Sequence, residues 1–135
     1  MDTSSFLLKQ GWRYMQDGCT KLGLSYSEGM VLLALVSHGN INQEQISKES
    51  DINKFLISKI VTSIEEKGYV SRNINPNNRR EYIVQLTESG KEKAQELIAI
   101  RMEWSRIVYQ GLSQSEIDFL NQILNKMVKN ICQNA

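Results

Sequence analysis

Basic side chains are concentrated in one stretch of this 135-residue chain, between residues 53 and 80. The stretch holds six basic residues and two acidic ones, a net charge of +4, whereas the whole chain carries +1, so the remainder carries −3. Basic side chains bind phosphate groups, and such binding requires a local surplus of positive charge. The near-neutral total argues against a protein that binds any polyanion indiscriminately.

Two expected elements hold these residues. The first is a helix over residues 53–67, whose core stripe is spaced at intervals of three, one and three: Ile57, Ile60, Val61 and Ile64. The polar face opposite this stripe carries Lys54, Phe55, Ser58, Lys59 and Thr62. The second element is a turn over residues 75–78, Asn-Pro-Asn-Asn, with Arg79 and Arg80 directly after it. Lysine can contact phosphates or guanine edges, and hydroxyls can bond phosphates or bases.

Hydrophobic spacing and capping residues predict the other elements. We expect an amphipathic helix over residues 5–22, a very apolar helix from the Ser25/Glu28 capping box to residue 36, and a short helix capped by Asn42. Beyond residue 68 the period changes from 3.6 to 2, which predicts two strands up to residue 86. Thr87 then caps a long helix to about residue 109, and Ser113 with Glu116 begins a last amphipathic helix.

This order predicts a mainly α fold with a small β-hairpin wing (α+β), a winged helix–turn–helix flanked by N- and C-terminal helices. We expect one domain over residues 1–135, with the winged region at 25–88 and a helical dimerisation region at 1–24 and 89–135. The flanking helices have apolar stripes that the small winged module alone cannot cover. A two-fold homodimer is the simplest way to bury them.

The segment from Leu24 to Gly90 resembles the MarR (multiple antibiotic resistance regulator) family of bacterial transcriptional regulators. Three runs carry the resemblance: LSYSEGMVLLALVSHG, SIEEKGYVSR and VQLTESG, with the two arginines of the turn between the last two. The resemblance implies a cytoplasmic homodimer whose recognition helices enter successive major grooves of a pseudo-palindrome in double-stranded DNA, while the wings reach the minor grooves. Many members repress their own operon and release DNA when a small phenolic ligand or an oxidant acts.

On this resemblance the expected DNA-binding residues are those of the recognition helix (Asn53, Lys54, Phe55, Ser58, Lys59 and Thr62) and of the wing (Asn78, Arg79 and Arg80). By position in the family pattern, Arg80 would enter the minor groove and Arg79 would contact phosphate. The family usually has Asp where Asn78 stands. Here only an uncharged amide would be available to orient the Arg80 side chain.

A second departure is the pair Phe55 and Leu56, where small polar residues are common in the family. Phe55 could press against a thymine methyl group or pack beneath the neighbouring helix, and both interpretations stay open. Leu56 lies about 40° from Ile60 around the helix, so we expect it in the core.

Four aromatic residues on the expected dimer helices could line a pocket for a small aromatic effector, or could simply be core: Trp12, Tyr14, Trp104 and Tyr109. Cys19 is expected to be a buried small hydrophobe rather than an oxidant sensor, and Cys132 a terminal thiol. The single histidine, His38, is expected at a helix C-terminus, so we expect no metal site and no cofactor.

Enzyme interpretations lack support, because the chain has no phosphate-binding glycine loop and its carboxylates fall on solvated helix faces. No apolar run is long enough to predict a membrane span. We therefore expect a sequence-specific regulator, a repressor released by a small ligand. The alternative is a winged-helix module that binds protein through the same face, with Phe55 as its anchor.

Overall fold

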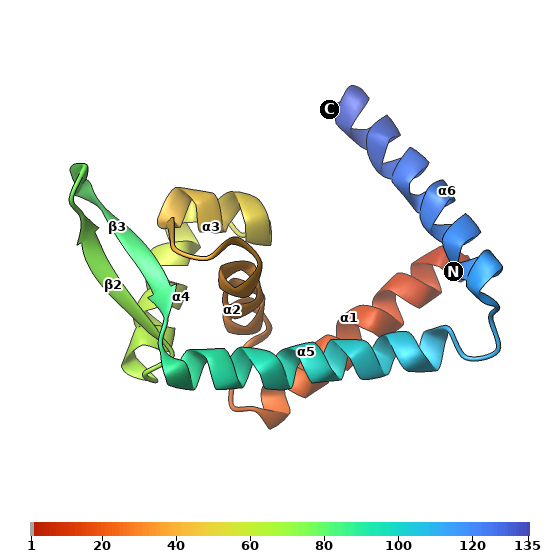
Figure 1. Ribbon diagram of the computed structural model, residues 1–135, viewed down its shortest axis with the longest axis horizontal. Helices are drawn as coiled ribbons and strands as arrows, with labels where there is room; N and C mark the ends of the chain where they lie inside the picture. The colour runs from red at the N-terminus through yellow and green to blue at the C-terminus, as the bar shows by residue number, and fades with distance from the viewer. Residues whose placement is uncertain (1) are drawn as a thin grey trace. The chain divides into compact units, whose positions relative to one another are not determined.

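The computed structural model describes residues 2–135 and divides into two compact units, one ending at Met102 and one beginning at Glu103. The elements in chain order are α1 (Thr3–Lys21), α2 (Tyr26–His38), β1 (Ile41–Asn42), α3 (Gln43–Ser50), α4 (Lys54–Glu66), β2 (Val70–Asn75), β3 (Asn78–Leu86), α5 (Glu88–Val108) and α6 (Gln114–Gln133) (Figure 1). The predicted fold class, mainly helical with a small β-hairpin wing, is confirmed.

Capping residues set where the helices begin. The predicted capping boxes at α2 and α6 are present: in each, the serine side chain accepts from the backbone of the third helical residue, and the glutamate there accepts from the serine backbone. Asn42 and Gln45 form a third box at α3, and Asn53 caps α4 by accepting from the backbone N–H of Phe55 at 2.8 Å. These local hydrogen bonds satisfy amides that the first helical turn leaves unpaired.

The sheet has three strands in the order β1-β3-β2, all antiparallel. The sequence did not predict β1, which pairs Ile41 with Val84 and Asn42 with Ile83, because two residues are too few to show an alternating pattern. β2 and β3 form the wing, joined by the two-residue turn Pro76-Asn77, and extend away from the helices (Figure 1). The predicted turn therefore lies at the far end of a projecting hairpin.

The core of the first unit is built around α2, whose Val31 and Leu32 are fully buried, and is closed by α4 through Ile57, Val61 and Ile64. The predicted α4 stripe is thus largely confirmed, with Ile60 half-buried at its edge. The prediction that Leu56 belongs to the core is wrong: its side chain is 53% exposed. Leu56 lies beyond the edge marked by Ile60 and in the first turn of the helix, where no neighbouring element covers it.

The loop after α4 and the start of α5 lie directly against each other and are joined by hydrogen bonds. The Thr87 hydroxyl donates to the Gly68 carbonyl at 2.6 Å, and the Thr87 N–H donates to the Tyr69 carbonyl at 3.0 Å. Gly90 lies against the same carbonyl, so that a Cβ at this position would be 1.9 Å from the Tyr69 oxygen. This close approach requires a residue without a side chain at position 90, and the Thr87 hydroxyl bonds across the same contact.

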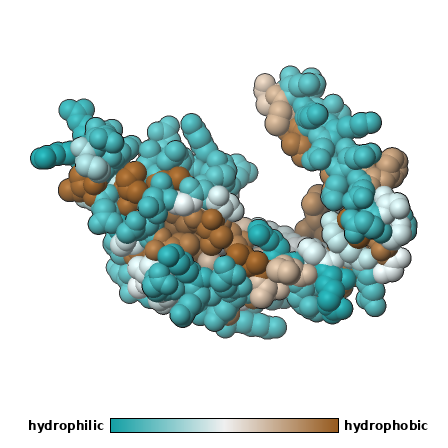
Figure 2. Space-filling view, viewed as in Figure 1, coloured by the Kyte–Doolittle hydropathy of each residue, from teal (hydrophilic) through white to brown (hydrophobic). Residues whose placement is uncertain are grey.

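The second unit holds the end of α5 and the whole of α6, an amphipathic helix of 20 residues without a single buried side chain. Its apolar positions follow helical spacing and are exposed: Phe119, Ile123, Leu124, Met127, Val128 and Ile131. Figure 2 shows brown, apolar atoms along this helix. Across residues 2–135, a single helix with the length and apolar character for a membrane span does not occur; only α1 and α2 together, bent by 93°, meet that criterion.

Candidate nucleic-acid interface

The N-terminal half of α4 is an open surface. Lys54, Phe55, Ser58 and Lys59 are all exposed, together with the capping residue Asn53. The first turn of the helix contains no acidic residue. Asn53 accepts from the backbone N–H groups of Phe55 and Leu56, and the helix dipole makes this N-terminus favourable for an anion such as a phosphate.

The C-terminal half of α4 is braced against the wing by Arg72 of β2. The Arg72 Nη2 atom donates to Glu65 Oε1 and to Thr62 Oγ1, both at 3.0 Å, and its guanidinium lies 5.8 Å from the ring centre of Tyr82. The hydrogen bond from Arg72 is the main cause that lowers the pKa of Glu65. Thr62 also donates to the Ser58 carbonyl at 2.8 Å, so this predicted DNA-binding residue already links helix to wing.

A second brace joins the end of α4 to the start of α2 through Glu28, which is 6% exposed. Its Oε2 atom accepts from Ser63 Oγ at 2.9 Å and lies 3.0 Å from Lys67 Nζ, while its Oε1 atom accepts from the Ser25 backbone at 2.8 Å. Lys67 also donates to the Gly23 carbonyl at 3.0 Å. Helix α4 is therefore held at its C-terminal end by residues some forty positions earlier in the chain.

The charge on Glu28 is favoured by these partners. Burial by itself raises the pKa of this carboxyl, but the hydrogen bonds from Ser25, Lys67 and Ser63 outweigh it and hold the pKa below its usual range. The sequence identified Glu28 only as a capping residue. Its contact with Lys67 could not be found from spacing, because the two residues are distant in the chain.

We expect Glu28→Gln to lower the free energy of unfolding by about 2 kcal/mol at neutral pH, since charge-assisted hydrogen bonds are lost. Because the folded pKa of Glu28 lies below its unfolded value, the stabilisation is complete above the unfolded pKa and disappears as the pH falls through the folded one. Urea unfolding from pH 7 down to about pH 3 should show the two proteins converging.

The matched control for this experiment is Glu66→Gln, which alters an exposed carboxylate at the same end of α4. This variant should unfold within about 0.5 kcal/mol of the natural chain at every pH. A difference between the natural chain and Glu28→Gln that stays constant across the pH series would contradict an electrostatic role for Glu28.

The wing presents two arginines. Arg79 and Arg80 are exposed, and within residues 2–135 neither guanidinium forms an ion pair. Asn78 Oδ1 accepts from the backbone N–H of Arg80 at 3.2 Å rather than from its guanidinium, so Asn78 shapes the strand and leaves the side chain free to turn. The end of the hairpin is hydrophilic, teal in Figure 2. Both cations are thus available to an anionic partner.

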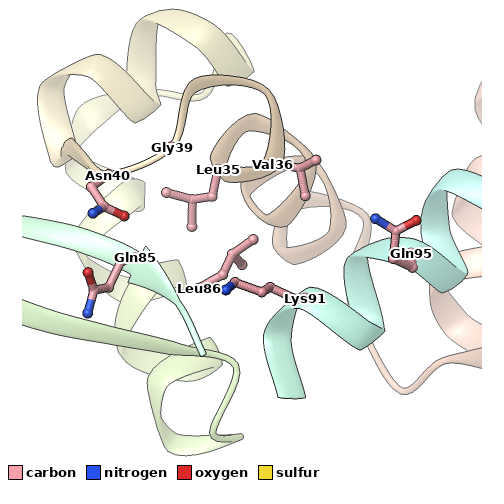
Figure 3. Close-up of a pocket in the computed structure, with 8 residues that line it drawn as sticks. All are labelled: Leu35, Val36, Gly39, Asn40, Gln85, Leu86, Lys91 and Gln95. Atoms are coloured by element: carbon pink, nitrogen blue, oxygen red, sulfur yellow. The ribbon is translucent and has the colours of Figure 1, made fainter. Parts of the chain in front are cut away.

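The four aromatics predicted for an effector site are divided between the units: Trp12 and Tyr14 are in the first, Trp104 and Tyr109 in the second. The Trp12 ring packs on Tyr26 with centroids 5.7 Å apart. A pocket of about 550 Å³ that the sequence did not predict lies between α2, β3 and α5 and contains none of the four. Leu35, Val36 and Leu86 give it an apolar floor, and amides and Lys91 surround it (Figure 3).

The cysteines and the histidine lie where the sequence placed them. Cys19 is fully buried, and burial, followed by the charge of Glu28, raises the pKa of its thiol, which disfavours a reactive thiolate. Cys132 is exposed. His38 ends α2, and its Nε2 atom lies 2.8 Å from Glu49 Oε2. In the described residues, no three His, Cys, Asp or Glu side chains come together as a metal-binding group.

Comparison with known proteins identifies relatives of this chain. Residues 24–82 match the MarR family model. An uncharacterized HTH-type transcriptional regulator of Bacillus subtilis (strain 168), YdcH, is 31% identical over 93 residues, which cover 61% of this chain. The match spans 63% of YdcH, less than two thirds of that relative.

Two solved structures share the fold over nearly the whole chain. A MarR transcriptional regulator from Methanosarcina mazei Go1 has a TM-score of 0.86 and 26% identity, with 97% of this chain and 94% of that chain covered. A putative MarR family regulator from Listeria monocytogenes, solved in complex with a 26mer DNA, has a TM-score of 0.85 and 19% identity, with 96% and 87% covered.

Proposed function

The chain belongs to the MarR family of transcriptional regulators, and from that premise we propose that it binds a specific operator in double-stranded DNA through α4 and the wing. Members of this family are DNA-binding transcription factors and not enzymes. One observation carries the proposal: Lys54 and Lys59 on the open half of α4, and Arg79 and Arg80 on the wing, are exposed cations without a carboxylate partner in the described chain.

The distribution of these cations supports contact with two neighbouring grooves. The brace of Arg72, Glu65 and Thr62 fixes the wing strand against α4, so both basic surfaces belong to one module. A helix fits the major groove of B-DNA, and arginine is favoured in a narrow minor groove with enhanced negative potential. We assign base and phosphate contacts to Asn53, Lys54, Phe55, Ser58, Lys59 and Thr62, and wing contacts to Asn78, Arg79 and Arg80.

We propose that the active form is a homodimer that binds a pseudo-palindrome. Support comes from the exposed apolar side chains of α1, such as Phe6 and Leu8, and from α6, whose apolar stripe has no cover within its own unit. A second copy would bury both surfaces, and a two-fold dimer matches a site with two half-sites. A putative MarR family regulator from Listeria monocytogenes was solved with DNA as its partner, the kind of partner proposed here.

Repression, and release of DNA by a small aromatic ligand, complete the proposal in the form that the family resemblance suggests. The alternative, a module that docks protein through the exposed end of α4, rests on the exposure of Phe55 alone. It leaves the unpaired cations of the wing without a role. DNA binding accounts for both features.

Fluorescence anisotropy with duplexes tiled across the region upstream of the protein's own gene, at two salt concentrations, tests the proposal. We expect tight binding to one palindromic duplex, absent on scrambled DNA and saturating at two chains per duplex. Affinity should fall steeply with salt, because each neutralised phosphate releases counterions. Weak, equal binding to every duplex would reduce the interface to general electrostatics, and no binding at either salt would favour protein docking.

A further inference from the structure

Two large apolar side chains occupy the first turn of α4, where the surface is otherwise basic and polar. Phe55 is 79% exposed and Leu56 is 53% exposed. Consecutive helical residues point about 100° apart, so the pair covers the N-terminal tip of the helix and not one narrow stripe. Phe55 therefore does not pack beneath the neighbouring helix, and an exposed apolar patch with a polar rim marks a site of interaction.

The charges around the pair indicate an anionic partner. The Lys54 Nζ atom lies 5.8 Å from the ring centre of Phe55, Lys59 is exposed on the next turn, and no acidic residue is present in the first turn. The partner of this surface must be negatively charged overall and apolar at one point.

The hydrogen-bonding capacity of this turn is very limited. Its four residues run from Lys54 to Ile57, and Lys54 alone has a polar side chain. Ile57 is fully buried, so Phe55 and Leu56 make up the remaining surface. Within these four residues, recognition therefore depends on apolar contact, apart from what Lys54 supplies, and the capping residue Asn53 lies directly before them.

In the major groove the only apolar group on a base-pair edge is the C5-methyl of thymine. Building on the operator binding proposed above, we propose that Phe55 and Leu56 read thymine methyl groups, so that each half-site has thymine where the first turn of α4 meets the bases. A G·C pair at that position has no methyl group, so the apolar contact of Phe55 and Leu56 would be lost and affinity would fall.

Deoxyuridine, which differs from thymidine by the loss of this methyl group alone, tests the proposal. The operator duplex from the anisotropy experiment is compared with one in which the half-site thymines are replaced by deoxyuridine. A third duplex has the same number of replacements outside the half-sites. We expect affinity to fall about fourfold for each methyl group that the pair buries, and to stay unchanged for the third duplex.

The same duplexes are then titrated with Phe55→Ala and Leu56→Ala. Each variant should bind the thymine operator more weakly and lose the part of the sensitivity to deoxyuridine that its missing side chain supplies. Val36→Ala, which shortens an exposed apolar residue on α2, is the matched control and should keep the full sensitivity.

Each outcome is decisive, and the measurement on the natural chain holds even if a variant fails to fold. Equal affinity of the natural chain for thymine and deoxyuridine half-sites, with binding still specific and salt-dependent, would overturn the methyl readout and leave operator binding intact. Undiminished sensitivity to deoxyuridine in both variants would assign the methyl contact to other residues and also overturn the proposal. No binding to any duplex would overturn the operator proposal itself, and the methyl readout with it.

Discussion

Gly90→Ala is expected to destabilise the winged module by about 3 kcal/mol, the upper range for forcing atoms into a well-packed site. The new Cβ would lie 1.9 Å from the Tyr69 carbonyl oxygen, a backbone atom that cannot rotate away. Relief requires α5 to move from the loop after α4, which also strains the hydrogen bonds of Thr87 to Gly68 and Tyr69. Thermal unfolding should show a melting temperature lower by roughly 10 °C.

The direction of this effect separates packing from helix propensity. Gly90 lies in α5, where alanine is intrinsically favoured over glycine by about 1 kcal/mol, so propensity alone predicts stabilisation. Ser89→Ala, at the exposed neighbouring position, is the control and should change stability by less than about 0.5 kcal/mol. A Gly90→Ala protein as stable as the natural chain at equal concentration would contradict a tight contact between Gly90 and the Tyr69 carbonyl.

Arg80→Ala is expected to reduce operator affinity by about tenfold to a hundredfold while leaving the fold intact. The side chain is exposed at the wing and without an ion pair in the described residues, so its removal costs no internal contact. Anisotropy at several salt concentrations measures the affinity, and thermal unfolding checks the fold. Arg79→Ala should instead weaken binding to all duplexes and reduce the salt slope by about one.

Arg13→Ala is the matched control, since it removes an exposed arginine from α1 and so changes the net charge equally. It should lower operator affinity by less than about twofold, the part that general attraction contributes. An Arg80→Ala protein with unchanged operator affinity would remove the wing from the mechanism. If Arg80→Ala lowers the operator affinity and the melting temperature together, Arg80 has a role in folding.

The elements predicted correctly are those that local chemistry determines. The capping boxes at Ser25 and Ser113 and the cap at Asn42 each join residues three apart, so spacing alone reveals them. The change of period after residue 68 likewise reveals the hairpin. Strand β1 was missed because its two residues form a strand only through their pairing with β3.

The features that could not be predicted depend on contacts between distant residues. Leu56 has the spacing of a core residue, and only the packing around α4 reveals that nothing covers it. Glu28 meets Lys67 because α2 and α4 fold against each other, and Gly90 meets Tyr69 for a similar reason. The pocket beside Leu35 and Leu86 combines residues of three elements, so it has no linear signature.

The two ends of α4 have different roles, and this has a consequence for how the protein can evolve. Thr62, Ser63, Glu65 and Lys67 carry every bond that holds the helix to α2 and to the wing. The residues from position 54 to 59, apart from Ile57, are exposed and carry none of this attachment. Operator preference can therefore change by substitution at residues 54 to 59, whereas Thr62, which accepts from Arg72 and is also assigned a DNA contact, cannot change without affecting the attachment of the wing. Through the first half of the helix, duplicated copies could acquire new target genes without first losing stability.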